Sequence, residues 1–298
     1  MAPTATNETP RLSVVVVSFN TCEVLAECLD SVFRDLPDFG VEVIVVDNAS
    51  SDGSAAMVAQ RFPTARLVRN PRNRMFSAAN NQGLRLARGD YVVILNSDTV
   101  VSREFLETLA WHLDENPDVA AVVGSRADED GTRWTTFWPQ HSFDDLLRIL
   151  FPVIWLKPPV GKQMPRVDEL PLRAVEEVEI VSDGCVMVRL SALRELGYYD
   201  ERLRLYYTED DLSIRLRRAG WRLASLRDAV FFHHGARSTR KHPLTAAAVM
   251  SADRMRFVAK HMGLTRAALL APVAAFDLLW RWHLVLRHRL RVSLRGEG

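Results

Sequence analysis

Three short groups of polar residues stand directly after apolar, β-branched segments in the first hundred residues. They read Ser18-Phe19-Asn20, Asp47-Asn48-Ala49-Ser50 and Asn96-Ser97-Asp98. Segments of this kind are typical of strands buried on both faces of a sheet. One such polar side chain can simply cap the helix that follows it. Three groups favour a ligand site, because ligands of parallel sheets bind beyond the carboxyl ends of the strands.

The chemistry of these side chains suits a nucleotide and a metal ion. Asp47 and Asn48 offer an acceptor and a donor to the edge of a base, and Asn73 and Asn81 can line the same side. The Asp98 carboxylate can hold a divalent cation while phosphate oxygens and water complete the shell, as is usual for Mg²⁺. Such a cation would stabilise charge on a departing diphosphate. The alternative is that Asp98 caps a helix.

A second acidic group, Thr208-Glu209-Asp210-Asp211, opens a predicted helix. Thr208 with Asp211 three residues later resembles a capping box, so part of this group is structural. Capping needs one acid at most, which leaves Glu209 and Asp210 as candidates for a general base. His233 follows another apolar segment and can serve as a third metal ligand or as a contact to the diphosphate.

Composition and missing motifs exclude several classes of protein. The 298 residues include 48% hydrophobic and 25% charged residues, which is typical of a globular chain of one or two domains. Lys and Arg (38) balance Asp and Glu (37), so no nucleic-acid partner is expected. The first strand is not followed by Gly-x-Gly-x-x-Gly, and no Walker A motif occurs, which argues against a dinucleotide dehydrogenase or a P-loop NTPase. Three cysteines are too few for a disulfide framework, which fits a reducing cytosol.

Strand and helix patterns alternate along the chain and predict how these side chains are positioned. Strands are predicted at Leu12–Val17, Val41–Val46, Arg66–Val68, Tyr91–Leu95, Val119–Val123, Glu179–Arg189, Arg222–Ser225 and Ala229–Phe232. Helices are predicted at Glu23–Phe33, Ser54–Arg61, Ser77–Arg88, Arg103–Asn116 and Leu212–Ala219. This alternation predicts an α/β fold with a Rossmann-like, doubly wound, mostly parallel sheet.

The stretch 131–172 interrupts this alternation with six prolines and three tryptophans. It predicts a long loop that carries a short amphipathic helix, Phe143–Leu150, and such loops are often lids or binding loops. The alternative is a surface excursion packed by its own aromatic side chains. Two helical segments, Pro243–His261 and Thr265–Leu290, follow near the end of the chain. We therefore expect a first domain at 1–242 and a helical extension at 243–298.

Taken together in this order, the motifs resemble those of family 2 glycosyltransferases of the GT-A fold, particularly a bacterial branch of rhamnosyltransferase-like enzymes of surface-polysaccharide assembly. The resemblance covers roughly residues 12–240. Its landmarks are Val16-Val17-Ser18-Phe19-Asn20, Val46-Asp47-Asn48-Ala49-Ser50, Asn80-Asn81-Gln82-Gly83, Leu95-Asn96-Ser97-Asp98, Asp183-Gly184-Cys185, Gly197-Tyr198-Tyr199-Asp200, Glu209-Asp210-Asp211-Leu212 with Arg215, Gly220-Trp221 and His233. The joint order of these landmarks makes the resemblance specific.

The resemblance implies a role for each matching residue. The residues expected at the nucleotide are Ser18, Asn20, Asp47 and Asn48, with Ser97 beside them. Asp98 stands at the family's Asp-x-Asp motif and is expected to hold Mg²⁺ or Mn²⁺. Asp183 and Gly184 are expected on the side of the sugar and the acceptor, together with Asp211. The acids at 209–211 are expected to supply the base that deprotonates the acceptor hydroxyl.

The chain departs from the family pattern at three places. Asn96 replaces the first aspartate of Asp-x-Asp, which removes one charge from the metal site, and Met75 stands where a glycine is usual. The usual Glu-Asp-x-Asp-Leu is shifted in the acidic group. Alignment on the final Asp-Leu makes Glu209 the base, whereas alignment on Glu-Asp makes it Asp210. We favour Asp210 here, because the shorter acid follows Glu as in the family.

These features predict an inverting glycosyltransferase that moves a sugar, such as rhamnose, from a dTDP- or UDP-sugar to a hydroxyl of a glycan or lipid-linked acceptor. A haloacid-dehalogenase-like phosphatase would need a nucleophilic carboxylate where this chain has Asn96. The remaining alternative is a non-catalytic nucleotide-sugar or glycan-binding protein of the same fold. The retained acidic group at 209–211 disfavours that alternative.

The C-terminal part of the sequence is basic and apolar. From Asp253 to Gly298, nine Lys or Arg residues stand against three acids, so this part carries +6 and the preceding part about −5 of the total of +1. Apolar residues between Leu264 and Leu286 predict an interfacial helix on an anionic membrane surface, and docking on the first domain or in a homodimer is the alternative. The N-terminal residues do not resemble a signal sequence. We expect a cytoplasmic protein, peripheral at the inner face of the cell membrane.

Overall fold

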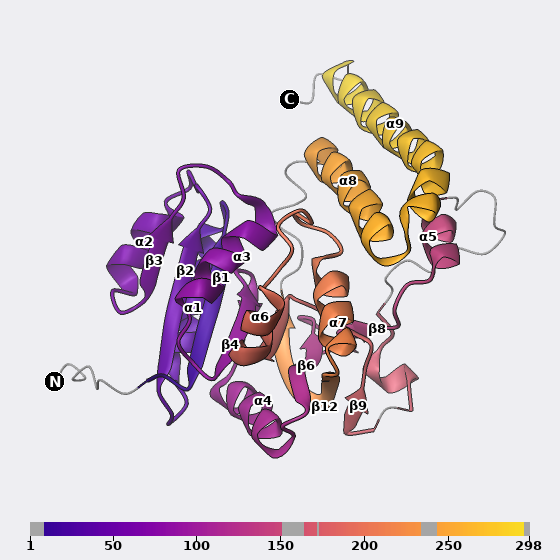
Figure 1. Ribbon diagram of the computed structural model, residues 1–298. Helices are drawn as coiled ribbons and strands as arrows, with labels where there is room; N and C mark the ends of the chain where they lie inside the picture. The colour runs from indigo at the N-terminus through magenta and orange to yellow at the C-terminus, as the bar shows by residue number, and fades with distance from the viewer. Residues whose placement is uncertain (1–8, 151–163, 172, 234–242, 295–298) are drawn as a thin grey trace.

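The computed structural model describes residues 9–150, 164–171, 173–233 and 243–294. At its centre lies a ten-stranded mixed sheet with the strand order β3-β2-β1-β4-β11-β6-β12-β5, in which β7 also pairs with β6 and β9 with β12. Figure 1 shows helices packed around this sheet, with the two C-terminal helices side by side at one end. The α/β prediction is therefore confirmed.

The first four strands of the sheet are parallel. They are β1 (Leu12–Ser18), β2 (Val41–Asp47), β3 (Arg66–Arg69) and β4 (Tyr91–Asn96). In the register of these strands Ser18 pairs with Asp47, and Val17 pairs with Asn96. The three polar groups identified in the sequence consequently meet at one carboxyl edge.

The remaining strands of the sheet give it mixed character. They are β5 (Thr99–Val100), β6 (Val119–Ala127), β7 (Arg133–Trp134), β9 (Val175–Glu177), β11 (Cys185–Arg189) and β12 (Arg222–His233). Strand β11 runs antiparallel between β4 and β6, whereas β12 is parallel to β6 and antiparallel to β5. This last pairing extends the carboxyl edge to the end of β12.

Two strand predictions differ from the structure. The segment predicted as one strand at Glu179–Arg189 is divided into β10 (Ile180–Val181) and β11, because β10 pairs instead with β8 (Phe137–Trp138). The two strands predicted within 222–232 are one strand, β12, whose register shifts between Leu226 and Val230. A local irregularity of this kind interrupts the apolar pattern without ending the strand.

Helices cover both faces of the sheet. One core cluster joins Val14 of β1 to α1 (Cys22–Arg34), α2 (Ser54–Arg61) and α4 (Arg103–Glu115). The other joins the neighbouring Val15 to α3 (Met75–Leu86), α6 (Leu190–Leu196) and α7 (Thr208–Arg218). Successive strand residues point to opposite faces, so the continuous apolar run in β1 is explained by a sheet buried on both sides.

A third core cluster lies beside the sheet. It joins α5 (Phe143–Leu150), α7, α8 (Pro243–His261) and α9 (Leu264–Leu294) through Leu146, Ile214, Phe257 and Leu270. The stretch 131–172 reaches this cluster through α5 and also contains the short helix η1 (Val167–Glu169); residues 151–163 and 172 of that predicted loop lie outside the described residues. None of the described helices combines the length and apolar character needed to cross a membrane.

Candidate active site

A cavity of about 800 Å³ opens at the carboxyl edge of β1 and β4. One end of the cavity is lined by Val17, Phe19, Asn48 and the loop before α3. The other end is built by the start of α7 and the first half of α8. The sequence-predicted residues that line it are Asn48, Asn73, Ser97, Asp98, Asp183, Glu209 and His233. The fold thus collects residues from both halves of the chain around one space.

Ser18 and Asp47 lie at this edge, just behind the cavity wall. The Ser18 hydroxyl is 3.0 Å from that of Thr21, which in turn donates to the Ser97 hydroxyl at 3.0 Å. Asp47 is 4% exposed, and its Oδ2 accepts from the backbone N–H of Ser50 at 3.2 Å. Among the described residues, nothing donates a hydrogen bond to Asp47 Oδ1. This oxygen is a spare acceptor at the end of β2, beside the cavity.

Asn20 organises the loops at the same edge. Its backbone has a φ of 54°, a left-handed conformation that asparagine tolerates better than most residues. Its side-chain Oδ1 accepts from the backbone N–H of Ser51 at 2.8 Å, and its own N–H donates to the Ser50 hydroxyl at 3.0 Å. Asn20 therefore ties the end of β1 to the loop after β2, and it is not among the residues that line the cavity.

Asn48 fixes the loop that precedes α3. Its Nδ2 donates to Asn73 Oδ1 at 2.9 Å, and its Oδ1 accepts from the backbone N–H of Arg74 at 2.9 Å. Asn73 Oδ1 also accepts from the backbone N–H of Met75 at 2.7 Å. Met75 has a φ of 63°, which is costly for a residue with a side chain. The amide network holds this conformation at the cavity wall, where Asn48, Asn73 and Met75 are lining residues.

Asn81 has a different place from the one predicted. It is fully buried in α3, where its Nδ2 donates to the Tyr199 carbonyl at 2.9 Å and its Oδ1 accepts from the Tyr199 N–H at 3.0 Å. Its Nδ2 also lies 3.1 Å from Glu201 Oε1. These bonds join α3 to the turn after α6, and Asn81 does not line the cavity. Its amide is used by the fold because both of its polar atoms bond to the backbone of Tyr199.

Asp98 and His233 meet on the cavity wall. The pairing of β5 with β12 sets His233 opposite Thr99, and this brings His233 Nε2 to 3.0 Å from Asp98 Oδ1. Asp98 is 9% exposed. The helix-capping alternative is not observed, since Ser102 caps α4 by accepting from the backbone N–H of Phe105 at 3.1 Å. Asp98 therefore presents its carboxylate with an imidazole at the cavity.

The acids at the start of α7 are arranged around Thr208. The Thr208 hydroxyl lies 2.8 Å from Asp183 Oδ2 and 3.0 Å from Glu209 Oε2, so one hydroxyl links two carboxylates. The N-cap is Tyr207, with a φ of 59°, rather than Thr208 as predicted. The Thr208 hydroxyl bonds to Asp183 rather than to a backbone N–H of the first turn of α7. Burial and the nearby charges of Asp183 and Glu209 raise the pKa of Tyr199 well above its ordinary value.

Gly184 follows Asp183 in the break between β10 and β11. Its carbonyl accepts from the backbone N–H of Asn96 at 2.9 Å. A Cβ at Gly184 would stand 3.4 Å from Asn96 Nδ2, an ordinary van der Waals distance, so the backbone hydrogen bond rather than the missing side chain holds the loop of Asp183 against the end of β4.

The other two acids of α7 point into the protein. Asp210 is 1% exposed and accepts a hydrogen bond from Trp138 Nε1 at 3.2 Å. Asp211 is 1% exposed and is held by Arg215 Nε at 2.7 Å and His261 Nε2 at 2.7 Å. Of the three acids, only Glu209 is among the residues that line the cavity. The sequence favoured Asp210 as the base, whereas in the structure Glu209 is the acid that lines the cavity.

With this geometry in place, the comparison with known proteins is specific. Residues 13–197 match the family described as Glycosyl transferase family 2. The chain belongs to this family. The N-acetylglucosaminyl-diphospho-decaprenol L-rhamnosyltransferase of Mycobacterium tuberculosis is 28% identical over 276 residues, which are 86% of this chain and 87% of that protein. The succinoglycan biosynthesis protein ExoO of Rhizobium meliloti is 31% identical over 133 residues, which are 42% of this chain and 38% of that protein.

Solved structures confirm the GT-A fold of this glycosyltransferase. The mannosyltransferase PcManGT from Pyrobaculum calidifontis, solved with GDP-Man and Mn²⁺, has a TM-score of 0.53 and 19% identity and covers 98% of this chain and 89% of its own. GalNAc-T7, solved with UDP, GalNAc and Mn²⁺, has a TM-score of 0.55 and 17% identity over 76% of this chain. The match spans 44% of the GalNAc-T7 chain.

Several residues of the glycosyltransferase's cavity were not predicted from the sequence. His141 lines the cavity, and its Nε2 lies 3.9 Å from Asp210 Oδ1. The first half of α8 contributes Thr245, Val249 and Arg254 to the wall. The family resemblance covers residues up to about 240, so it assigns no functional motif to α8. The spacing of apolar residues in α8 predicted only a helix.

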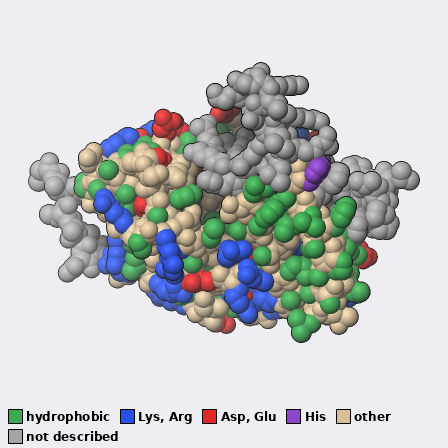
Figure 2. All heavy atoms as spheres, turned by 90° about the horizontal axis from the view of Figure 1, so that it is seen from above, with side chains coloured by type: hydrophobic (Ala, Val, Ile, Leu, Met, Phe, Trp, Pro, Cys, Tyr) green, Lys and Arg blue, Asp and Glu red, His purple; other side chains and the backbone are tan. Residues whose placement is uncertain are grey.

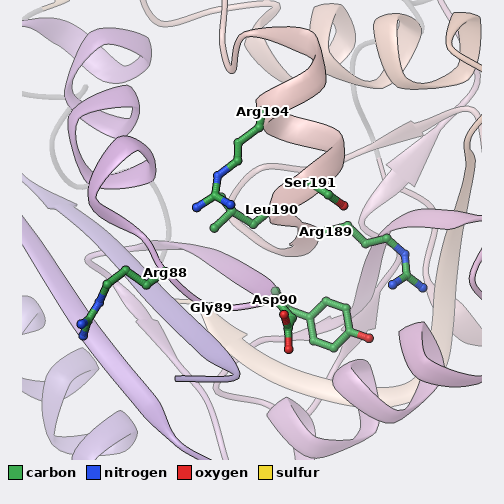
Figure 3. Close-up of a pocket in the computed structure, with 8 residues that line it drawn as sticks. Arg88, Gly89, Asp90, Arg189, Leu190, Ser191 and Arg194 are labelled. Carbon is green, nitrogen blue, oxygen red and sulfur yellow. The ribbon is translucent and has the colours of Figure 1, made fainter. Parts of the chain in front are cut away.

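A second cavity, of about 330 Å³, lies at the amino-terminal end of β4, away from the first cavity (Figure 3). Its lining includes Arg88, Arg189 and Arg194, but each is already bonded. Arg88 Nε donates to Glu42 Oε2 at 3.1 Å, Arg189 Nη2 to the Asn116 carbonyl at 2.9 Å, and Arg194 Nη2 to a backbone carbonyl at 3.1 Å. In Figure 3 the guanidinium groups of Arg88 and Arg189 point away from each other. These charges connect elements of the fold, and we assign no ligand to them.

Proposed function

We propose that this glycosyltransferase is an inverting enzyme that moves a sugar from a dTDP- or UDP-sugar to a hydroxyl of a glycan or lipid-linked acceptor in cell-surface polysaccharide synthesis. The observation that carries the proposal is that Asp98, Asp183 and Glu209 line one cavity beyond the carboxyl edge of the sheet. The relative from M. tuberculosis is named for transfer of L-rhamnose to a decaprenyl-linked acceptor. That name supports rhamnose and a lipid-linked acceptor as the first substrates to test.

The nucleotide is assigned to the end of the cavity formed by β1, β2 and the loop before α3. Asp47 Oδ1 is an acceptor with no donor among the described residues, which suits the N–H of a pyrimidine ring; Asp47 does not itself line the cavity, so this contact requires the wall at Asn48 to open. Asn48 and Asn73 line the same end, and their mutual hydrogen bond of 2.9 Å keeps the wall rigid. Ser18, Asn20 and the loops they hold would support this wall from behind rather than by direct contact.

The donor atoms beside the diphosphate position fit Mg²⁺ or Mn²⁺. Asp98 offers a carboxylate, and His233 offers an imidazole 3.0 Å away. No cluster of three or more metal-ligating side chains occurs in the described part of the chain, which suits a cation that completes its shell with phosphate oxygens and water. When bound, such an ion supplies positive charge that stabilises the departing diphosphate.

Glu209 is proposed as the base. It lines the cavity, whereas Asp210 is 1% exposed and bonded to Trp138 Nε1. Glu209 accepts the proton of the acceptor hydroxyl while that oxygen forms a bond to the anomeric carbon. The bond from this carbon to the diphosphate oxygen breaks on the opposite face, so the configuration inverts. Asp183, linked to Glu209 through the Thr208 hydroxyl, is positioned to bind the sugar or the acceptor.

Donor binding tests this proposal directly. The protein is heated with a panel of dTDP-, UDP- and GDP-sugars, each with Mn²⁺, with Mg²⁺ or with a chelator. A donor at about 100 times its dissociation constant should add roughly 2.7 kcal/mol to the free energy of unfolding. We expect a metal-dependent shift with a dTDP- or UDP-sugar. Absence of a shift with every nucleotide sugar would overturn the assignment of the cavity.

We also propose that α9 rests on an anionic membrane surface, where a lipid-linked acceptor would be presented. Its exposed apolar side chains include Leu269 at 64%, Phe276 at 62% and Leu279 at 67% exposure. Figure 2 looks down on this end of the molecule, where hydrophobic side chains gather over the side occupied by α8 and α9. The sequence from Asp253 onward carries +6, and basic charge beside an apolar helix face favours anionic lipid.

Vesicle flotation tests the membrane proposal. We expect the protein to float with vesicles that contain phosphatidylglycerol and to remain below with phosphatidylcholine alone. The double variant Phe276→Ser with Leu279→Ser should stay below in both cases. Trp111→Ser is the matched control, since Trp111 is 64% exposed on α4 and should not affect flotation. The proposal would be contradicted if the double variant floated like the wild type. It would also be contradicted if sedimentation measurements showed a dimer of the wild type and a monomer of the double variant, because α9 would then be buried between two copies.

A further inference from the structure

One short segment, Leu203–Tyr207, joins the two ends of the cavity. At the nucleotide end, the Arg204 carbonyl accepts from the backbone N–H of Phe76 at 2.9 Å and of Ser77 at 3.2 Å, at the start of α3. At the other end, Tyr207 is the N-cap of α7 and stands two residues before Glu209. The position of this segment therefore sets the position of Glu209 relative to the nucleotide end.

Asp253 of α8 holds this segment from behind. It is fully buried, and its Oδ2 accepts from three successive backbone N–H groups, those of Arg204 at 3.0 Å, Leu205 at 2.9 Å and Tyr206 at 3.2 Å. Hydrogen bonds to a carboxylate are stronger than those to a neutral acceptor. Few side chains could replace this arrangement, since one oxygen must satisfy three N–H groups that point to the same place.

The same helix holds the acid group of α7 at two further points. Arg254, 1% exposed, donates from Nε to the Tyr207 hydroxyl at 3.0 Å. Lys260 Nζ lies 2.6 Å from Asp211 Oδ1, and His261 Nε2 lies 2.7 Å from the same oxygen. Glu209 stands between these attachments in the sequence. Helix α8 thus fixes the chain on both sides of the proposed base.

We infer that α8 is part of the catalytic unit, and that Asp253 is a positioning residue that sets where Glu209 lies over the donor. This inference rests on the proposed function, because it assumes transfer with Glu209 as the base. Asp253 touches neither the cavity nor Glu209; it acts through the backbone of 204–206. Displacement of a reacting group by about 1 Å can lower a rate about 100-fold.

The test compares Asp253→Asn with Asp114→Asn in the full chain. Asp114 accepts from the Tyr91 hydroxyl at 2.7 Å at the far edge of the sheet, so its variant controls for a general loss of stability. At a temperature where both variants are folded, we expect Asp253→Asn to lower kcat about 100-fold with donor affinity unchanged. Asp114→Asn should keep kcat. Tyr207→Phe, which removes only the hydroxyl bonded by Arg254, should lower kcat by a smaller factor.

Hydrogen exchange separates failure of this inference from failure of the proposed function. In Asp253→Asn, the backbone amides of Phe76, Ser77 and Asp211, which donate to the carbonyls of Arg204 and Tyr207, should exchange faster than in the wild type, while those of α4 should not. Unchanged exchange in α7 overturns the inference whether or not a donor is known. Unchanged kcat in an active Asp253→Asn protein overturns the inference and leaves the proposed function standing. A wild type inactive with every donor overturns the proposed function alone.

Discussion

Asp98 and His233 stand 135 positions apart and meet because the two-residue strand β5 pairs with the last residues of β12. A carboxylate beside an imidazole is a donor pair that a divalent cation can use only if both atoms face the same space. Both residues line the cavity. The metal proposal therefore depends on a single strand pairing at the edge of the sheet.

Replacement of Asp98 by Asn should remove the metal-dependent part of donor affinity, because the neutral amide is a poor ligand for a hard cation. His233→Gln should weaken it by about 10- to 100-fold, because the imidazole that lies 3.0 Å from Asp98 Oδ1 is lost both as a donor to the cation and as a partner of that carboxylate. Calorimetric titration of the donor with and without Mn²⁺ measures both effects. Asp114→Asn is the control. Equal donor affinity for Asp98→Asn and wild type in Mn²⁺ would refute the metal assignment.

Met75 shows a backbone requirement at the scale of one residue. Its φ of 63° is a conformation that glycine adopts without cost and other residues adopt at a cost of about 1 kcal/mol or more. The family resemblance implies a glycine at this position, and Met75 adopts a backbone conformation that suits glycine. Strain at a cavity wall can be retained where the surrounding hydrogen bonds fix the chain.

Met75→Gly should consequently raise the free energy of unfolding by about 1 kcal/mol. Met57→Gly, in the middle of α2, should lower it by about 1 kcal/mol, because glycine weakens a helix interior. Urea denaturation measures both changes. A Met75→Gly protein less stable than the wild type would show that the left-handed conformation is not strained.

The candidate site could be predicted residue by residue only where a motif carried it. Asp98, Asp183 and Glu209 were identified from their order in the sequence, and all three line the cavity. The sequence favoured Asp210 as the base, whereas Glu209 is the acid that lines the cavity. Neighbours on a helix face different directions, and the sequence does not give the rotation of α7. Asn81 matched a motif for a structural reason, its bonds to the Tyr199 backbone.

At the scale of elements, the buried Asp211 carboxylate ties helix α7 to α8 through Lys260 and His261. Burial alone would raise the pKa of Asp211, but its hydrogen bond to His261 and the charges of Arg215 and Lys260 lower it below the ordinary value of 3.8. A carboxyl group whose pKa is lower in the folded state than in the unfolded state stabilises the folded state at pH values above its unfolded pKa. This stabilisation is complete above about pH 3.8 and is lost as the pH falls through the lower folded pKa.

Asp211→Asn should therefore lower the free energy of unfolding near neutral pH by about 3 kcal/mol, since it leaves the partly buried Arg215 and Lys260 without their charged partner. The difference between variant and wild type should shrink as the pH falls below 3.8. Guanidinium denaturation at a series of pH values measures this. A difference that stays constant down to the acid transition would show that the Asp211 charge does not contribute.

The strands that are buried on both faces were predictable, because a continuous run of β-branched residues is typical of such strands. The breaks were not. Asp183 and Gly184 divide a run that reads as one strand, since the partner of Ile180 is Trp138, in the proline-rich stretch. The N-cap at Tyr207 was missed because aromatic residues rarely adopt its φ of 59°, and contacts from α8, such as the hydrogen bond from Arg254, are not visible in the sequence.

At the scale of the whole molecule, the helical extension and the sheet domain share a core. Phe257 of α8 is fully buried, and its ring stacks on that of Tyr207 at 5.0 Å between centroids. The same cluster contains Ile180 of β10 and Ile214 of α7. The division at residue 242 was drawn from the helical pattern of the segments after it, and such a pattern does not show a contact between segments.

Phe257→Ala should lower the free energy of unfolding by about 3 to 5 kcal/mol, the usual range for removing a buried aromatic ring. The variant and the wild type should each unfold in one transition, with circular dichroism and tryptophan fluorescence coinciding. An early, separate loss of helical signal in the variant would show that 243–298 folds as an independent unit.

Acceptor-dependent release of nucleoside diphosphate tests the central claim most directly. The wild type, Glu209→Gln and Asp210→Asn are supplied with the donor found by the binding panel and a lipid-linked N-acetylglucosaminyl diphosphate. We predict turnover by the wild type, retained activity in Asp210→Asn, and a loss of about 10²- to 10⁴-fold in Glu209→Gln with unchanged donor affinity. Wild-type turnover by Glu209→Gln would contradict Glu209 as the base, and donor binding without transfer to any hydroxyl acceptor would favour a non-catalytic nucleotide-sugar-binding protein.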